Sequence, residues 1–308
     1  MRDHFIKELI KQAQSDPMVI LITGDLGFGV FDDFRRLLPK QFINAGVAEQ
    51  NMTAMACGLA MEGYKVFTYS IGNFPTLRCL EQIRNDICYH NVDVTIVSIG
   101  GGFSYGQLGV SHFATEDLSI MRAIPNMTVL TPSSNDQVVE MVQAITEIQG
   151  PKYLRLDKDS GPEIEDTPSF KLGRINRLID GSDATIICIG GIVNEALIAA
   201  DMLRQKGISL RVLSVSTLKP LEIDEIILAA EETGMIFTLE ENTILGGLAG
   251  AVSEICMSHG AFPKKFQALG IPDIFPEVVG DQQYLRKHFK LDSESLTHLI
   301  SELQHPKD

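Results

Sequence analysis

Tryptophan is absent from this chain of 308 residues, and cysteine is scarce. The cysteines are odd in number and widely spaced, and each lies in an apolar segment: Cys57, Cys79, Cys88, Cys188 and Cys256. This usage excludes a disulfide-rich secreted scaffold and favours small buried side chains in a reducing compartment. Neither a Cys-x-x-Cys nor a His-x-x-x-His spacing occurs, so we expect no transition-metal site made by this chain alone.

Long apolar runs and an excess of positive charge are also missing. No stretch approaches the roughly twenty apolar residues that a membrane-spanning helix needs, and the N-terminal segment predicts an amphipathic helix instead of a signal peptide. The formal net charge of −14 repels nucleic acids and anionic membranes. We therefore expect a cytoplasmic protein that binds neither nucleic acid nor membrane. A polyanionic ligand would need positive charge from a metal ion or another chain.

The chain instead contains short β-rich runs that alternate with amphipathic helices. Predicted strands lie at 18–22, 65–69, 92–97, 127–130, 184–190, 210–213 and 235–239. Predicted helices lie at 3–14, 50–61, 76–90, 136–148 and 194–205, with a last one after Asp292. This alternation and the length indicate an α/β fold with two doubly wound, mostly parallel-sheet domains.

A polar segment with glycine and proline follows Asp157 and interrupts this alternation. Such composition is typical of a connection between domains. We therefore predict a first domain at 1–158, a linker at 159–180 and a second domain at 181–308.

Glu49 lies between a predicted buried strand at 41–43 and the almost uncharged helix at 50–61, so we expect dry surroundings. Burial favours the neutral form of a carboxyl group, and such a group can share a proton with a ring nitrogen. An acidic residue in a first helical turn can also simply complement the helix macrodipole. This segment alone leaves both interpretations open.

Ligands of doubly wound sheets bind outside the carboxyl ends of the strands, where we also expect Asp25, the loop 99–109 and His112. The loop is rich in glycine and could either approach a phosphate or act as a flexible connection; it is not a P-loop. His112 could relay a proton or be structural. Phe74 could pack in the core or stack on a planar ring.

Several separated motifs resemble the C-terminal two thirds of transketolase, meaning its pyrimidine-binding and C-terminal domains. The motifs occur in the family's order and cover nearly all of the chain. They are GVAEQNM at 46–52, RCLEQIRN at 78–85, SH at 111–112 through MRAIPNMTV at 121–129, YLRL at 153–156, EEN at 240–242 and GG at 246–247.

The resemblance implies thiamine diphosphate as cofactor. Glu49 would hydrogen-bond N1′ of the aminopyrimidine ring, which favours the imino tautomer that removes the C2 proton of the thiazolium. Phe74 would pack on the aminopyrimidine ring, and Asp25 would lie near the cofactor. His112 would contact hydroxyl groups of the substrate or intermediate.

The chain departs from the family at positions near the substrate and cofactor. Lys158 falls where the family usually places an arginine for the substrate phosphate. Gly100 replaces a second substrate histidine, and Leu108 replaces an aspartate that reads a substrate hydroxyl. Ile71 and Leu77 stand at two further aromatic positions near the cofactor. The resemblance implies transfer of a two-carbon ketol unit between sugars, and these departures predict a non-standard sugar as substrate.

The resemblance does not extend to a diphosphate-binding domain with its Gly-Asp-Gly motif. Gly24-Asp25-Leu26 and Gly280-Asp281-Gln282 do not supply that motif. This implies a separate partner subunit that holds the diphosphate and Mg²⁺, with no metal ligand on this chain. We expect homodimerisation within a heterotetramer containing two copies of each chain.

Three alternatives share part of this pattern. The β subunit of a 2-oxo acid dehydrogenase has the same domains and glutamate, but the segment 111–128 favours transketolase. A deoxyxylulose-phosphate synthase would carry its diphosphate domain in the same chain. A non-catalytic dimerising scaffold would not need Glu49, Phe74 and His112 together.

Overall fold

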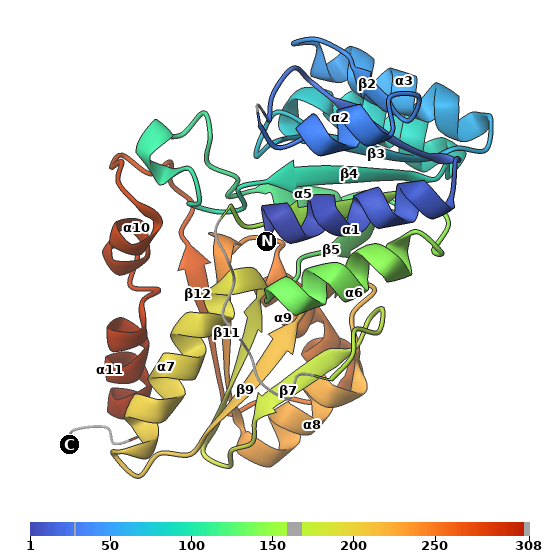
Figure 1. The fold of residues 1–308 in the computed structure, drawn as a ribbon. Coiled ribbons are helices and arrows are strands. Elements are labelled where there is room, and N and C mark those ends of the chain that lie inside the picture. Colours follow the sequence, from blue (N-terminus) through green and yellow to red (C-terminus); the bar gives the residue numbers. More distant parts are fainter. Residues whose placement is uncertain (28, 159–167, 305–308) are drawn as a thin grey trace.

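The computed structural model describes residues 1–27, 29–158 and 168–304. Two α/β units lie one above the other in Figure 1. The first contains a seven-stranded sheet with the order β10-β5-β6-β4-β3-β1-β2. Its strands are β1 (Val19–Thr23), β2 (Phe42–Asn44), β3 (Lys65–Ile71), β4 (Val94–Ile99), β5 (Thr128–Leu130), β6 (Lys152–Leu156) and β10 (Thr217–Lys219). All neighbours are parallel except β10, which runs antiparallel to β5.

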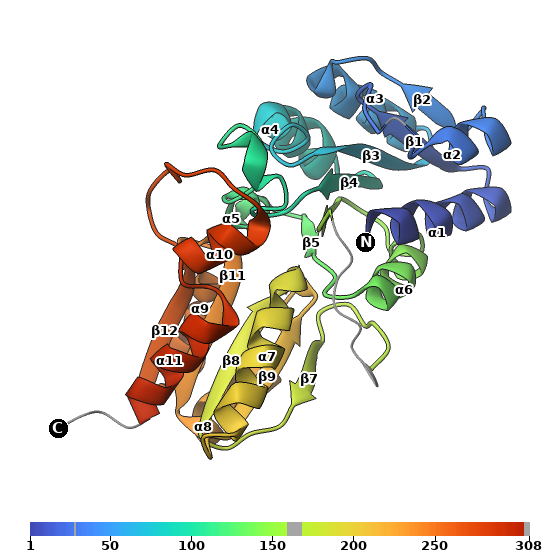
Figure 2. The same ribbon diagram turned by 60° about the vertical axis from the view of Figure 1, so that its left-hand side comes forward.

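Helices cover both faces of this sheet because its central strands are apolar on both sides. On one face, α1 (Arg2–Ser15) and α6 (Asn135–Ile145) lie side by side in Figures 1 and 2 and bury Phe5 and Met141. On the other, α3 (Glu49–Met61) and α5 (Asp117–Ala123) bury Met52 and Leu118. The short helix α2 (Asp32–Leu37) follows β1 and buries Phe34.

The second unit has a five-stranded sheet with the order β12-β11-β8-β9-β7. Its strands are β7 (Ile175–Ile179), β8 (Ala184–Ile189), β9 (Leu210–Val215), β11 (Met235–Thr243) and β12 (Lys265–Ile271). Its helices are α7 (Val193–Arg204), α8 (Asp224–Thr233), α9 (Leu248–His259), α10 (Gln282–His288) and α11 (Ser293–Gln304). Helices α7 and α11 cover one face, and α8 and α9 cover the other. The predicted pair of mostly parallel α/β domains is confirmed.

The predicted helix at 76–90 is not a regular α-helix. A 3₁₀ turn, η1 (Leu77–Cys79), leads into the short α4 (Leu80–Gln82) and then a π-helical segment, η2 (Ile83–Cys88). The buried residues Cys79, Ile83 and Ile87 recur every four positions. A regular helix also keeps this spacing within one apolar face, so the sequence pattern gave no sign of the widened turn.

The predicted linker at 159–180 ends too late. Residues 159–167 lie outside the described residues, but β7 already begins at Ile175 and forms the edge of the second sheet. β7 carries the charged Arg177, and charged side chains are common on edge strands. The strand β10 also returns to the first sheet, so the two units share backbone pairing.

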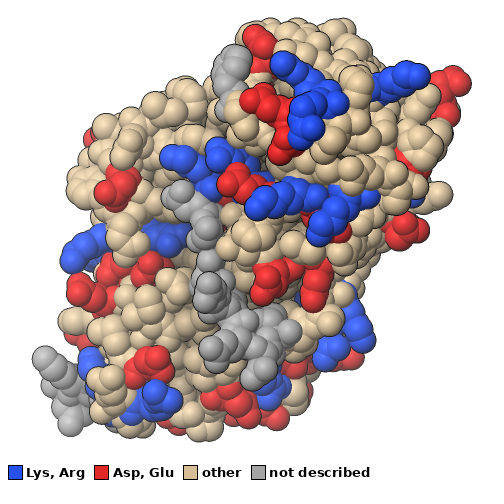
Figure 3. All heavy atoms as spheres, viewed as in Figure 1, with Lys and Arg blue, Asp and Glu red and all other residues tan. Residues whose placement is uncertain are grey.

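No helix in the described part of the chain is long and apolar enough to cross a membrane. On the face seen in Figure 3, acidic and basic side chains are interspersed, so the net charge of −14 does not gather there into one patch.

Candidate functional site

The predicted site residues gather along one edge of the first sheet. Strands β6, β4, β3 and β1 are parallel neighbours, so their carboxyl ends meet at that edge. They are followed respectively by Lys158, Gly100, Phe74 and Asp25. Three strand intervals separate β1 from β6, or about 14 Å.

Glu49 is the first residue of α3 and is buried, with a side chain 5% exposed. Gly24 passes close by, and a Cβ there would lie 3.5 Å from Glu49 Cγ. The expected burial is confirmed, but the carboxylate is not surrounded by apolar groups alone. Arg78 Nη1 donates to Glu49 Oε2 at 2.8 Å. The sequence pattern indicated Arg78 only as part of a family motif and did not assign it to the site.

A continuous row of contacts joins Glu49 to His112. The guanidinium carbon of Arg78 lies 4.6 Å from the centroid of the Phe74 ring. The ring of Phe74 in turn lies 5.2 Å from that of His112, with an edge-on interplanar angle of 69°. Phe74 and His112 are only partly buried. Phe74 therefore lies outside the apolar core and has a ring available for stacking.

Gly72 brings the His112 segment against the turn that carries Phe74. Its φ of 43° is in the left-handed region, and a Cβ would lie 3.1 Å from the carbonyl oxygen of His112. The hydroxyls of Thr76 and Ser98 both donate to the carbonyl of Gly72, at 3.2 and 3.1 Å. Glycine is needed here because of both the dihedral angle and the close approach.

The other predicted cofactor residues lie around this row. Asp25 is exposed and accepts a hydrogen bond of 2.9 Å from Asn44 Nδ2, next to the close approach of Gly24 to Glu49. Leu77 is exposed in η1, immediately before Arg78. Ile71 ends β3 and packs against the apolar cluster beneath α1 and α6.

The predicted substrate residues gather at the other end of the edge, around Tyr105. Gly100 has a φ of 89°, and a Cβ there would lie 2.2 Å from the Tyr105 ring. Lys158 Nζ lies 5.4 Å from the centroid of the same ring. Tyr105, Leu108 and Lys158 line a cavity of about 330 Å³ together with Gln282 from the second unit. Tyr105 was not singled out from the sequence, since only its folded position relates it to these residues.

A buried polar network fixes the second unit against this end. Glu241 in β11 accepts hydrogen bonds from the amide of Phe103 at 3.3 Å, from Gln282 Nε2 at 2.8 Å and from Arg286. Arg155 in β6 donates to the carbonyl of Glu241 at 2.7 Å. Burial, together with the charge of Glu241, raises the pKa of the neighbouring Asp157 to about 6.

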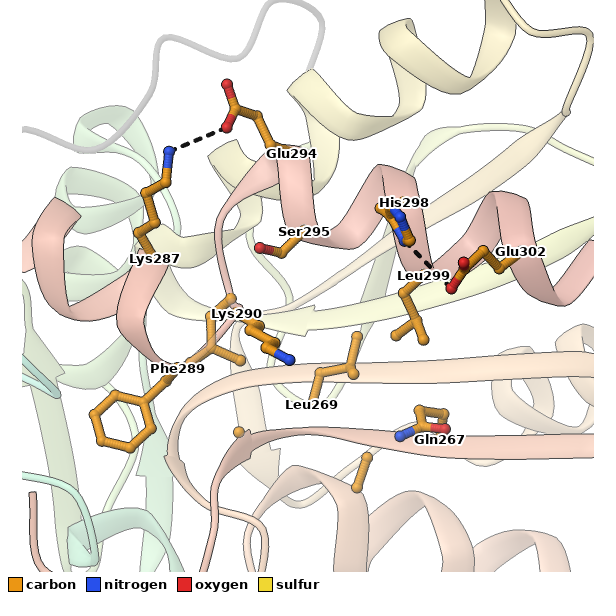
Figure 4. Close-up of a pocket in the computed structure, with 13 residues that line it drawn as sticks. Gln267, Leu269, Lys287, Phe289, Lys290, Glu294, Ser295, His298, Leu299 and Glu302 are labelled. Carbon is orange, nitrogen blue, oxygen red and sulfur yellow. Dashed lines mark hydrogen bonds and ion pairs between the residues drawn. The ribbon is translucent and has the colours of Figure 1, made fainter.

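A larger cavity, of about 730 Å³, lies elsewhere and contains none of the predicted site residues. It is bounded by β12 and α11, where Leu269 and Leu299 face each other in Figure 4. Lys287 pairs with Glu294 at 3.2 Å, and His298 pairs with Glu302 at 3.3 Å. These side chains already satisfy one another and do not converge on a point.

Within the described residues, no group of three or more histidine, cysteine, aspartate and glutamate side chains is arranged to hold a metal ion.

Two family models divide the chain. The one described as "Transketolase, pyrimidine binding domain" matches residues 1–163, and the one described as "Transketolase, C-terminal domain" matches residues 173–296. These ranges correspond to the first and second units of the structure.

Two curated relatives of similar length are named as transketolase subunits. An apulose-4-phosphate transketolase subunit of Phocaeicola vulgatus is 36% identical over 96% of this chain and 94% of its own length. The 6-deoxy-6-sulfo-D-fructose transketolase subunit SqwH of a Clostridium species is 33% identical over 100% of this chain and 95% of its own length. By contrast, the chain spans only 43% of the 1-deoxy-D-xylulose-5-phosphate synthase of Desulforudis audaxviator, at 32% identity.

A solved structure described as "Split gene transketolase, inactive beta4 tetramer" has a TM-score of 0.87 and 33% identity. The alignment covers 100% of this chain and 98% of that chain. The transketolase of Campylobacter jejuni, at 18% identity and a TM-score of 0.82, shares the fold over 98% of this chain and 46% of its own. Domain matches, relatives and fold agree, and this chain belongs to the transketolase family.

Proposed function

We propose that this chain is the pyrimidine-binding subunit of a two-component, thiamine diphosphate-dependent transketolase. It would transfer a two-carbon ketol unit between sugars. The observation that carries this proposal is the row of contacts from Glu49 through Phe74 to His112 at the carboxyl edge of the first sheet. A buried carboxyl group beside a partly exposed aromatic ring is the combination that an aminopyrimidine ring requires.

The roles of the residues follow from their positions. Glu49 holds or accepts a proton at N1′ of the aminopyrimidine, because its side chain is 5% exposed and little water competes for that hydrogen bond. Phe74 orients the ring through its face, Asp25 and Leu77 border the same region, and Ile71 ends the strand that leads to it. When bound, the cofactor supplies the carbanion and the electron sink for ketol transfer. His112 donates a hydrogen bond to substrate hydroxyls from the far side of Phe74.

The substrate would lie toward Tyr105, where Lys158, Gly100 and Leu108 replace the family's usual side chains. Lys158 is exposed beside the 330 Å³ cavity and would attract an anionic group on the sugar as a point charge. The names of two relatives specify a sugar phosphate and a sulfo sugar. We therefore propose a non-standard sugar with an anionic group as substrate. Turnover of ordinary pentose phosphates with the efficiency of a single-chain transketolase would contradict this assignment.

A partner subunit would supply the diphosphate and Mg²⁺ site. The net charge of −14 and the lack of a metal-binding cluster in the described residues argue against holding the diphosphate on this chain alone. Relatives of matching length are named as one subunit of their enzymes. We propose a heterotetramer in which two copies of this chain pair with two copies of the partner.

We place this enzyme in the cytoplasm, because all five cysteines are buried and unbridged. We prefer the transketolase assignment to that of a 2-oxo acid dehydrogenase β subunit, because the relatives named as subunits are transketolases.

Reconstitution tests the two-component proposal directly. The chain alone, given thiamine diphosphate, Mg²⁺ and ketose and aldose substrates, should give no turnover above background. Adding the subunit that carries the Gly-Asp-Gly motif should restore activity at a one-to-one ratio. Robust turnover by the chain alone would refute the division of the cofactor site between two subunits.

A further inference from the structure

Arg78 occupies both contacts that the proposed function assigns to the aminopyrimidine ring. Its guanidinium donates to Glu49 Oε2 at 2.8 Å and lies 4.6 Å from the centroid of the Phe74 ring. A guanidinium is planar, carries N–H donors and stacks on aromatic faces, so it resembles an aminopyrimidine in shape and hydrogen bonding. The two groups compete for the same carboxylate and the same aromatic ring.

We propose that Arg78 is a gate for the cofactor, a positioning residue whose side chain takes the place of the aminopyrimidine until the ring binds. This inference rests on the proposed function. Arg78 is 47% exposed in this chain, so its side chain can leave Glu49 without crossing the core of the chain. Its backbone stays anchored, because Gln50 Nε2 donates to the carbonyl of Arg78 at 3.1 Å. We therefore expect the side chain to move while the backbone keeps this contact.

The burial of Glu49 explains why Arg78 would occupy the site in the absence of the cofactor. A buried carboxylate without a cation or hydrogen-bond partner is unfavourable, so the empty site needs a substitute partner. Arg78 supplies it when the ring is absent. Entry of the ring exchanges one partner of Glu49 for another, and the apparent affinity for cofactor is reduced by the fraction of chains in which Arg78 holds the site.

Binding of thiamine diphosphate to the two-chain complex tests the gate. Calorimetric titration in the presence of Mg²⁺ compares the wild type with Arg78→Met, Arg78→Lys and the control Arg84→Met. Arg78→Met should bind about three- to tenfold more tightly, because the competitor is gone. Arg78→Lys should show a smaller gain in affinity, since a lysine keeps the positive charge but lacks the planar guanidinium. Arg84 is exposed and donates to Asn85, so Arg84→Met should stay within about twofold of the wild type.

Glu49→Gln provides the decisive background, because a neutral amide holds the guanidinium weakly. In the Glu49→Gln variant, the gain in cofactor affinity from Arg78→Met should shrink to less than about twofold. Weaker or unchanged binding by Arg78→Met, in a complex whose wild type binds the cofactor, would overturn the gate while leaving the proposed function intact. A wild-type complex that does not bind thiamine diphosphate would overturn both. Thermal unfolding of each variant checks that the chains are folded. If Arg78→Met does not fold, the comparison of Arg78→Lys with the wild type still tests the gate.

Discussion

Glu49 and Glu241 are equally buried carboxylates near the carboxyl edges of the two sheets, but their partners differ. Both side chains are 5% exposed. Glu241 is held by Arg286, which is 11% exposed, and also by Gln282 and the amide of Phe103. The cation beside Glu49 is 47% exposed. Burial alone therefore does not distinguish these two carboxylates, whereas the exposure of their cationic partners does.

The largest expected difference is in catalysis. Glu49→Gln should reduce turnover of the reconstituted complex by about 10²- to 10⁴-fold, because the amide cannot exchange a proton with a ring nitrogen. Its melting temperature should change little, since the amide oxygen still accepts from Arg78. Steady-state kinetics and thermal unfolding measure the two effects. Activity within about threefold of the wild type would instead favour the non-catalytic scaffold.

For stability, we expect the larger loss when the cation beside Glu241 is removed and the smaller loss when the cation beside Glu49 is removed. Arg286→Met leaves Glu241 and Glu195 without their shared buried cation and should lower the free energy of unfolding by about 3–5 kcal/mol. Arg78→Met should lower it by about 1 kcal/mol, because water reaches the space left by a half-exposed side chain. Urea titrations of the four combinations of wild-type and variant residues measure both losses. Equal losses would remove the distinction between the two carboxylates.

The network around Glu241 also predicts a pH dependence. Burial and the charge of Glu241 raise the pKa of Asp157 from 3.8 to about 6, so the folded chain binds this proton more tightly than the unfolded chain. The resulting stabilisation is complete below about pH 4 and is lost as the pH rises through about 6. Between pH 4 and 7, the free energy of unfolding should fall by about 2 kcal/mol more in the wild type than in Asp157→Asn. Parallel curves from urea titrations at several pH values would contradict the shift.

The smallest expected effect concerns Lys158. This residue is exposed just after β6, whereas Arg155 within β6 is buried. Lys158→Met should raise the KM for an anionic sugar about tenfold and leave kcat nearly unchanged, since an exposed point charge contributes to binding. The melting temperature should stay at the wild-type value because Lys158 is exposed. A fall in kcat with constant KM would place Lys158 in the chemical step instead.

Much of the fold follows from local patterns in the sequence. Apolar runs such as 65–69 predicted β3, and the uncharged helix after Glu49 predicted its burial. The pattern could not reveal that β7 joins the second sheet or that β10 joins the first. Both are edge strands, and their positions depend on pairing with segments far away in the sequence.

The sequence by itself determined the alternation of strands and helices, the family motifs and the residues at the ends of several strands, because hydrophobic period and turn chemistry act over a few residues. Only the tertiary structure decided that Arg78, 29 residues from Glu49, pairs with it and lies over Phe74. The same holds for Tyr105 between Gly100 and Lys158. Such neighbours are set by the packing of strands and loops in three dimensions, and no local periodicity encodes them.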